Sequence, residues 1–465
     1  MTVPEETIEL RKVAVVDDAI TALKGSFGGE VVTANDAGYE AASQVWNGNV
    51  DRRPAVVARC HGVADVQRAL AFGVDRDLVV SVRGGGHSAP GYGTNDAGLV
   101  IDLSPLKGIR IDPTTGTVRA QGGVLWRELD RETQAFGLAT TGGTVSNTGI
   151  AGLTLGGGLG WLMGKHGLTV DNLVSADVVM ADGTFLAANA ETNSELFWAL
   201  RGGGGNFGIV VSFEYALHPV KDVLGGLVAY GLDQAPAVLR FYREFCATLP
   251  DEAEAYLALL TDPEAGVPVV AMLLGYNGDL DEGAEVLAPA RGFGQPVADL
   301  VGPMPYTARQ SMLDEPNAIN GLHRYWRSAF AEQISDELVD AVVDAAARFS
   351  SPLSALLFFH MHGAAARVPA DATAFSARRA LWDVDVIGQW VDGSESERHT
   401  AWVRETWQHC EPQLDAGGYV NHISGDDRPE KIRASYGTNL ERLRQLKSRY
   451  DPTNVLRMNP NITPA

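Results

Sequence analysis

The segment Val82–Ser88, which reads Val-Arg-Gly-Gly-Gly-His-Ser, constrains this chain more than any other. Three successive glycines let the main chain turn its N–H groups inward around a phosphate-sized anion, because no Cβ atom blocks a close approach. His87 then places a nucleophilic ring nitrogen directly beside that position. The pattern indicates the binding site of a covalently attached dinucleotide, and a glycine loop followed by an incidental surface histidine is the alternative interpretation.

A second glycine-rich segment runs from Thr141 to Trp161. It contains too much glycine for a packed helix and is too apolar for a solvated linker. Main chain of this kind is expected where the backbone lies flat against a bulky planar ligand. A series of tight turns is the alternative.

A third block, Gly203–Gly208, satisfies the G-x-G-x-x-G pattern of nicotinamide dinucleotide-binding proteins. In those proteins the motif follows a strand and opens a helix. Here it follows a helix-like segment, 194–200, and precedes a β-rich segment, 209–213. The order is reversed, so the block does not indicate a nicotinamide site.

Composition excludes several classes of protein. The 465 residues suffice for two large domains, and 45% hydrophobic with 20% charged residues is typical of an ordered globular chain. A net charge of −21 opposes binding to nucleic acid or anionic membranes, and no segment has the length of a membrane span. Cys60, Cys246 and Cys410 lack metal-ligand spacing. Because Met1–Arg11 has no apolar leader segment, we expect a cytoplasmic protein.

Three regions of the chain differ in the pattern of their expected elements. Residues 1 to about 220 alternate short β-rich segments with helices and glycine loops, and residues from about 221 to 418 combine longer strands and helices. The remaining residues again contain short motifs. The order of elements in the middle region predicts an antiparallel sheet backed by helices. Strands are expected at 56–58, 77–82, 98–103, 174–180, 226–230, 255–260, 267–275 and 353–362, and helices at 62–72, 125–136, 336–349 and 439–450.

The C-terminal region carries four further motifs. They are Tyr419-Val-Asn421, Tyr436-Gly-Thr-Asn439, Tyr450-Asp-Pro-Thr-Asn454 and Asn459-Pro-Asn461-Ile462. Together with the three glycine blocks in their order, they resemble the berberine bridge enzyme-like FAD-linked oxidases of the vanillyl-alcohol oxidase/p-cresol methylhydroxylase (PCMH) superfamily, in particular its 6-hydroxy-D-nicotine oxidase-like bacterial branch. The resemblance is strong over residues 35–220, good over 419–462 and weak between them.

The resemblance implies an α+β fold with two domains. An FAD-binding domain of the vanillyl-alcohol oxidase/PCMH type, made of two subdomains, would occupy residues 1–220 and be completed by a flavin-contacting segment, 419–465. Residues 221–418 would form a substrate domain, in which an antiparallel sheet covered by helices roofs the flavin.

The resemblance also implies that His87 bonds through a ring nitrogen to the 8α-methyl carbon of FAD. Many members add a thioether from a cysteine in the next block, but the matching position here is Val145, and valine cannot form that bond. A single covalent histidyl link is therefore expected. The residues expected to bind the cofactor are Arg83, Gly84, Gly85, Gly86, His87, Ser88, Gly143, Thr144, Val145, Thr148, Gly149, Gly152, Gly208, Val210, Tyr419, Asn421 and Asn459.

The implied activity is that of an FAD-linked oxidase. A hydride passes from a carbinol or amine carbon of a small organic substrate to flavin N5, and molecular oxygen reoxidises the flavin and gives hydrogen peroxide. A dehydrogenase with a protein or quinone acceptor and a non-catalytic flavin-binding protein are the alternatives. The oligomeric state is left open. An aromatic or secondary-metabolite substrate is favoured by Tyr325, Trp326, Phe358, Phe359, Trp382 and Trp390.

Tyr419 is the first candidate for the base that removes the proton from the substrate heteroatom, because it begins the segment that returns to the flavin in this family. That role requires neighbours that lower its pKa, and a core tyrosine bonded to the backbone is the alternative. His422 is a further candidate. Thr148 is expected near the reactive edge of the flavin, where its small hydroxyl would help to admit oxygen, or else it caps a turn.

His360 and His362 lie two residues apart in a strand-like segment, so their side chains are expected to share one face. Because the resemblance places this strand over the flavin, we expect at least one of them to face the substrate. No cysteine or carboxylate nearby completes a metal site, so metal binding is not expected. A solvated or buried histidine pair is the other interpretation.

Overall fold

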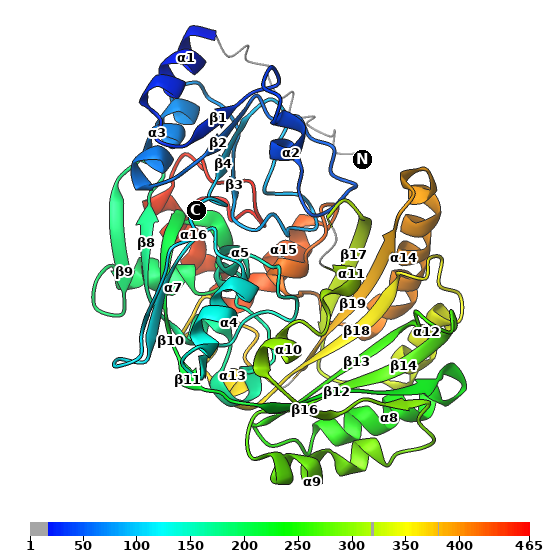
Figure 1. Cartoon of the computed structure of the whole chain (residues 1–465). Helices are drawn as coiled ribbons and strands as arrows, with labels where there is room; N and C mark the ends of the chain where they lie inside the picture. The colour runs from blue at the N-terminus through cyan, green and yellow to red at the C-terminus, as the bar shows by residue number, and fades with distance from the viewer. Residues whose placement is uncertain (1–16, 318–319, 380) are drawn as a thin grey trace.

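The computed structural model describes residues 17–317, 320–379 and 381–465 (Figure 1). The stretch Met1–Arg11, expected to lack a leader segment, lies outside these residues. Helices and sheets combine in the expected α+β fold. No helix in the described part is long and apolar enough to cross a membrane.

A four-stranded sheet carries the first glycine loop. Its order is β1-β2-β4-β3, with β2 and β3 parallel to β4 and β1 antiparallel to β2. The glycine loop leaves the end of β3, beside Asp102 at the end of β4. The elements here are α1 Asp17–Ser26, β1 Glu30–Val32, α2 Tyr39–Ser43, β2 Val56–Arg59, α3 Val63–Val74, β3 Val80–Arg83 and β4 Leu99–Asp102.

A five-stranded antiparallel sheet, β5-β6-β10-β8-β9, lies next along the chain. Its core includes Leu443 and Ile462, so the C-terminal segment packs with this half of the molecule. The elements are β5 Ile109–Asp112, β6 Thr117–Gln121, α4 Trp126–Gln134, β7 Leu138–Ala139, α5 Ile150–Leu155, α6 Met163–His166, β8 Leu173–Val179, β9 Phe185–Asn189, α7 Ser194–Leu200, β10 Ile209–Ala216 and β11 His218–Pro219, of which β7 and β11 form a separate pair.

The largest sheet is antiparallel, has eight strands and follows the order β15-β12-β14-β13-β18-β19-β17, with β16 also on β12. Four helices, α8, α9, α12 and α14, lie along the side that faces away from the N-terminal half (Figure 1). The elements are β12 Val223–Gly231, α8 Ala235–Cys246, β13 Ala253–Thr261, β14 Pro268–Tyr276, α9 Leu280–Arg291, β15 Ala298–Asp299, β16 Gly302–Met304, α10 Tyr306–Gln310, α11 Asp314–Asn317, β17 His323–Ala331, α12 Asp336–Ala346, β18 Ala355–Met361, α13 Gly363–Arg367, β19 Leu381–Trp390 and α14 Ser396–Cys410.

The two faces of this sheet differ in composition. Val384 and Val386 of β19 belong to the apolar core that the sheet shares with its helices. Successive side chains of a strand point to opposite faces, so Asp383 and Asp385 lie on the other face, toward the glycine loops. Two buried carboxylates on that face indicate that it serves a purpose other than packing.

The expected strands and helices lie near their predicted positions. The strand expected at 77–82 begins only at Val80, because Asp77 has a positive φ of 52° and closes the turn after α3. Two long strands, β17 and β19, were not predicted.

The C-terminal segment contains α15 Pro429–Tyr436 and α16 Leu440–Tyr450 and ends against the glycine blocks. Lys447 is fully buried, and its Nζ donates to Asp451 Oδ2 at 2.7 Å and to the Asn206 and Leu456 carbonyls. Asp451 in turn accepts from the Val455 and Leu456 N–H groups. This buried ion pair fixes the turn that brings the last residues back to the third glycine block.

Replacing Lys447 by Met leaves the Asp451 carboxylate buried without its cation. We expect the free energy of unfolding to fall by about 3–5 kcal/mol, as for other broken buried pairs. Urea unfolding followed by tryptophan fluorescence measures the change. The control is Lys107→Met, which breaks the exposed Lys107–Glu128 pair and should cost less than about 1 kcal/mol. Equal costs for the two variants would contradict the role of the buried pair.

Candidate active site

The first two glycine blocks touch each other through their main chains. A Cβ atom on Gly85 would lie 2.5 Å from the Gly149 nitrogen, and one on Gly149 would lie 2.5 Å from the Gly85 nitrogen. Gly86 adopts a φ of +72°, a conformation that L side chains rarely accept. Only glycine therefore permits this contact, which places His87 beside the second block.

His87 is partly buried and lines the cavity described below. Its ring stacks on Trp46, with centroids 4.6 Å apart and an interplanar angle of 22°. The buried Nε2 atom has no partner among the described residues. Burial lowers the His87 pKa to about 3, so the imidazole is neutral near pH 7 and Nε2 can act as a nucleophile.

A cavity of about 310 Å³ is lined by this histidine. Its other walls come from the glycine blocks, from the C-terminal segment and from the inner face of the eight-stranded sheet. All but one of the residues expected to bind the cofactor line it: Arg83, Gly84, Gly85, Gly86, His87, Ser88, Thr144, Val145, Thr148, Gly149, Gly152, Gly208, Val210, Tyr419, Asn421 and Asn459.

Gly143 is the exception, because it is not among the residues that line the cavity. Its carbonyl accepts a hydrogen bond from Gln310 Nε2 at 2.7 Å, and a Cβ atom on it would lie 2.5 Å from Leu153. It therefore supports the wall of the cavity without lining it.

The cavity suits a planar ring system joined to a polar chain. Its walls combine glycine main chain with aliphatic side chains such as Val82, Val210 and Leu155. In the C-terminal segment, Asn459 lines the cavity, and its buried Oδ1 atom has no partner in the described part of the chain. Buried polar atoms are normally hydrogen-bonded, so this atom is suited to a ligand.

Tyr419 lies in the wall of the cavity with three hydrogen-bond donors around its hydroxyl oxygen. The N–H groups of Gly158 and Leu159 donate to it at 2.9 and 3.4 Å, and Asn421 Nδ2 donates at 2.7 Å. Burial nevertheless raises its pKa to about 12, although the three donors act in the opposite direction. The lowered pKa expected for a base is therefore not found, but the donors are arranged to stabilise a negative charge on this oxygen.

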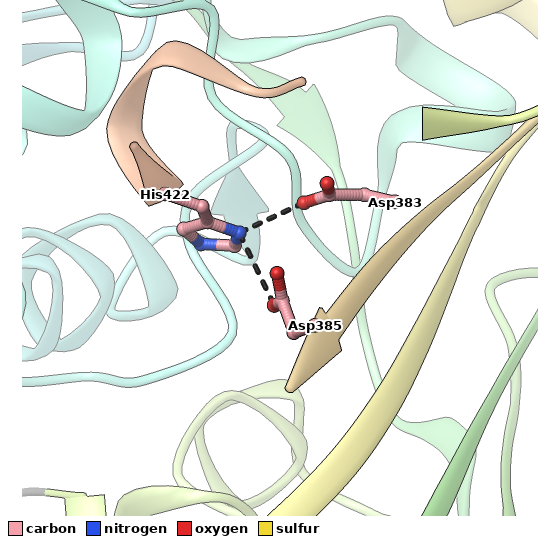
Figure 2. Close-up of side chains that lie close together, drawn as sticks. All are labelled: Asp383, Asp385 and His422. Atoms are coloured by element: carbon pink, nitrogen blue, oxygen red, sulfur yellow. Dashed lines mark hydrogen bonds and ion pairs between the residues drawn. The ribbon is translucent and has the colours of Figure 1, made fainter. Parts of the chain in front are cut away.

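His422 lies beside Tyr419 and is held from behind by two carboxylates (Figure 2). Its Nδ1 atom lies 2.8 Å from Asp383 Oδ2 and 3.2 Å from Asp385 Oδ2. Burial opposes a positive charge, but Asp385 and Asp383 outweigh it and raise the His422 pKa to about 10. Burial and Asp385 raise the Asp383 pKa to about 6. At neutral pH the cluster therefore presents a protonated imidazole at the cavity.

The same three residues have the spacing of metal ligands. A histidine must lose the proton from its ligating nitrogen to bind a metal ion, and the two carboxylates stabilise that proton on Nδ1. The geometry therefore favours a proton-holding group over a metal centre.

His360 and His362 do not line the cavity, and the expectation that one of them faces the substrate is corrected. In β18 the cavity-lining residues are Leu357 and Phe359, so His360 points to the opposite side and stacks on Trp382. His362 follows the strand, and its Nε2 atom lies 2.9 Å from the Ala253 carbonyl and 3.7 Å from Glu254. The two rings stack on each other in the interior.

Some aromatic residues of the middle region line the cavity, and others lie elsewhere in the structure. Trp326 and Phe359 line the cavity, and Trp46 joins them from the N-terminal half. Phe358 and Trp382 belong to the helix-covered core. Tyr325 is bonded to Asp426, and Trp390 is buried at the end of β19. Thr148 lies in the cavity wall.

Sequence reasoning did not identify Asp383 and Asp385. Their segment, Leu381–Trp390, alternates polar and apolar residues at Asp-Val-Asp-Val, which is a strand pattern with one polar face. Aspartate is rare in strands, and a pair of them on one face of a buried strand was the available signal.

Comparisons with known proteins agree with this geometry. The family model of an FAD binding domain matches residues 54–189, and the model of berberine and berberine-like proteins matches residues 418–463. An FAD-linked oxidoreductase of Dictyostelium discoideum is 31% identical over 421 residues, which cover 90% of this chain and 91% of that protein. (R)-6-hydroxynicotine oxidase of Paenarthrobacter nicotinovorans is 30% identical over 459 residues, covering 94% and 97%.

A solved structure shares the complete fold. The crystal structure of 6-hydroxy-D-nicotine oxidase from Arthrobacter nicotinovorans matches with a TM-score of 0.86 and 28% identity, and the match covers 95% of this chain and 99% of that chain.

Replacing Asp385 by Asn removes one of the two charges that hold the His422 proton, so we expect the His422 pKa to fall below its value of about 10. Side-chain ¹⁵N NMR of the histidines follows the titration, and His422→Gln identifies the signal. Asp426→Asn is the control, because it removes a neighbouring carboxylate that is not in the cluster. An unchanged titration in Asp385→Asn would refute the assigned electrostatics.

Proposed function

The chain belongs to the FAD-linked oxidoreductases with a berberine-like C-terminal segment, and on that basis we propose that it is an oxidase of small organic molecules. The substrate gives up a hydride from a carbinol or amine carbon, and molecular oxygen takes the electrons and is released as hydrogen peroxide. The observation that carries the proposal is the single cavity that joins the His87 loop to Tyr419 and His422. Membership of the family confirms the resemblance inferred from the sequence and the expected fold type.

The proposed cofactor arrangement is FAD with one covalent link, through His87. A neutral imidazole that lines the cavity and has a buried, unpartnered Nε2 atom supports this link. Val145 also lines the cavity and has no sulfur atom with which to form a second bond. In this proposal, residues 1–220 and 419–465 form the flavin domain and residues 221–418 form the substrate domain.

FAD supplies the acceptor for the hydride at its N5 atom. The protein must then orient the donor carbon and take up the proton of the substrate's hydroxyl or amine. We propose that Tyr419 takes this proton in its deprotonated form, which the Gly158, Leu159 and Asn421 donors stabilise. The protonated imidazole of His422 provides a hydrogen-bond donor or a positive charge on the same side of the cavity.

The apolar walls favour an aromatic or polycyclic substrate. Trp326, Phe359 and Leu357 offer flat or aliphatic surface, whereas a sugar requires many polar partners. The curated relative and the solved structure described above both carry the name of an oxidase of the same compound, (R)-6-hydroxynicotine, which agrees with an aromatic substrate. Thr148 is proposed to keep the passage for oxygen open at the flavin edge.

Replacing His87 by Ala should leave the flavin bound without a covalent bond. After acid precipitation of the wild-type protein the yellow colour should stay with the polypeptide, and in His87→Ala it should pass into the supernatant. Intact-protein mass spectrometry checks the result, because only the wild type should carry the added mass of FAD. A wild-type chain of unmodified mass would disprove the link.

Replacing Tyr419 by Phe should lower kcat/KM by about 10²–10⁴-fold, the usual contribution of a general base. In the wild type the deprotonated fraction of a group with a pKa of about 12 rises tenfold per pH unit below that value, so kcat/KM should increase with pH between 7 and 10. Tyr419→Phe should show a flat profile. Peroxide detection across a panel of aromatic alcohols and amines provides the assay, and an equally steep profile in the variant would rule Tyr419 out as the base.

A further inference from the structure

Trp46, on which His87 stacks, is itself held by the eight-stranded sheet. The guanidinium carbon of Arg324 in β17 lies 3.7 Å from the Trp46 ring centroid. Its Nη1 atom donates to the Trp46 carbonyl at 2.8 Å, and its Nε atom donates to Gln389 at 2.6 Å. Arg324 is 1% exposed. A buried cation over an indole ring is a strong contact, and here it links two distant parts of the chain.

The main chain around Trp46 is bonded on both sides. Toward the glycine loop, the Trp46 N–H group donates to the Gly86 carbonyl at 3.1 Å, and Asn47 Nδ2 donates to the Ala89 carbonyl at 2.7 Å. Toward β17, Asn47 Nδ2 also donates to the Arg324 carbonyl, and Asn47 Oδ1 accepts from the Arg324 N–H group. The segment thus connects the His87 loop directly to the edge strand of the sheet.

The segment leaves little room for rearrangement. A Cβ atom on Gly48 would lie 2.2 Å from the Gly321 carbonyl oxygen, so the two main chains are in close contact. The Trp46 indole N–H group donates to the Asn317 carbonyl at 2.6 Å. The plane of the Trp46 ring is therefore fixed by its contacts with Asn317 and Arg324, and the stacked imidazole takes its orientation from that plane.

We propose that Trp46 and Arg324 position the His87 imidazole for its covalent attachment to the flavin, so that attachment proceeds only once the β17 edge has docked against the glycine loop. Both are positioning residues, because they act through His87. The inference rests on the proposed histidyl link. It adds the requirement that the eight-stranded sheet pack against the His87 loop before the covalent bond forms.

The chemistry of attachment determines what Trp46 and Arg324, which we call the clamp, must do. One bond forms between His87 Nε2 and the 8-methyl carbon of the flavin, and one C–H bond of that methyl group breaks. The methyl C–H proton and the imidazole N–H proton are released, and the two electrons left on the flavin pass to molecular oxygen, which becomes hydrogen peroxide. The step needs a neutral imidazole whose lone pair points at the methyl carbon. Burial keeps the ring neutral, with the charge of Arg324 acting in the same direction, and stacking on Trp46 sets its angle.

The test compares rates of attachment rather than enzyme activity. Apoprotein variants made under flavin-limited conditions are incubated with FAD and oxygen, and intact-protein mass spectrometry follows the fraction of chains that carry the flavin mass. We expect Arg324→Met and Trp46→Leu to slow attachment at least about tenfold while still binding FAD reversibly, as seen in their visible spectra. Arg324→Lys keeps the charge but loses the planar guanidinium group. Its rate of flavin attachment should lie between those of these variants and the wild type.

Arg309→Met is the matched control. Arg309 is likewise a buried arginine over an indole ring, 4.2 Å from Trp161, but it does not line the cavity. Its loss should leave the attachment rate within about twofold of the wild type, as expected for a contact that does not orient His87.

The outcomes separate the two proposals. A wild-type chain that never gains the flavin mass refutes the histidyl link itself. A wild type that gains it, with Arg324→Met or Trp46→Leu gaining it equally fast, overturns the clamp. If Arg324→Met does not fold, Arg324→Lys decides, since an unchanged rate in that variant has the same meaning. Slowing in Arg309→Met equal to that in Arg324→Met would assign the effect to general destabilisation and also overturn the clamp.

Discussion

The site depends on the main-chain contact between Gly85 and Gly149. Any side chain at either position would force the two loops apart, because its Cβ atom would lie 2.5 Å from the other loop's backbone nitrogen. The contact brings together the loop that leaves β3 and the start of α5. His87 of the first glycine block therefore lines the same cavity as Val145 and Thr148 of the second block.

The eight-stranded sheet contributes in a different way, through the contrast between its faces. One face is apolar and is held by helices, whereas the other places Asp383 and Asp385 behind His422. Burying two carboxylates is costly, and the histidine between them offsets part of that cost by remaining protonated. Stability alone would favour apolar residues at these positions, so the cluster is best understood as part of the working site.

Much of the fold and of the candidate site could be predicted, because the sequence signals that carry them are local. Glycine blocks specify where main chain must approach a ligand, and apolar periodicity specified helices such as α7 and α12 close to their true bounds. The strand pairing that joins β17, β19 and β18 is not local. Asp383 and Asp385 became candidates only when the strand register placed them on the face of the sheet that points toward the cavity. The spacing of His360 and His362 could not indicate which side of the sheet they occupy. In the structure, His360 lies on the side away from the cavity, where it stacks on Trp382. Likewise, no pattern in the sequence relates Trp46 to Arg324.

The return of the C-terminal segment bears on how the protein is made. Leu456, Met458 and Asn459 complete the wall of the cavity, yet the ribosome adds them several hundred residues after the glycine loop that they face. While the nascent chain is growing, the loop therefore lacks part of its enclosure, and water has access to any coenzyme that reaches it. A chain shortened before residue 456 by premature termination or proteolysis would therefore lack part of the wall of this cavity.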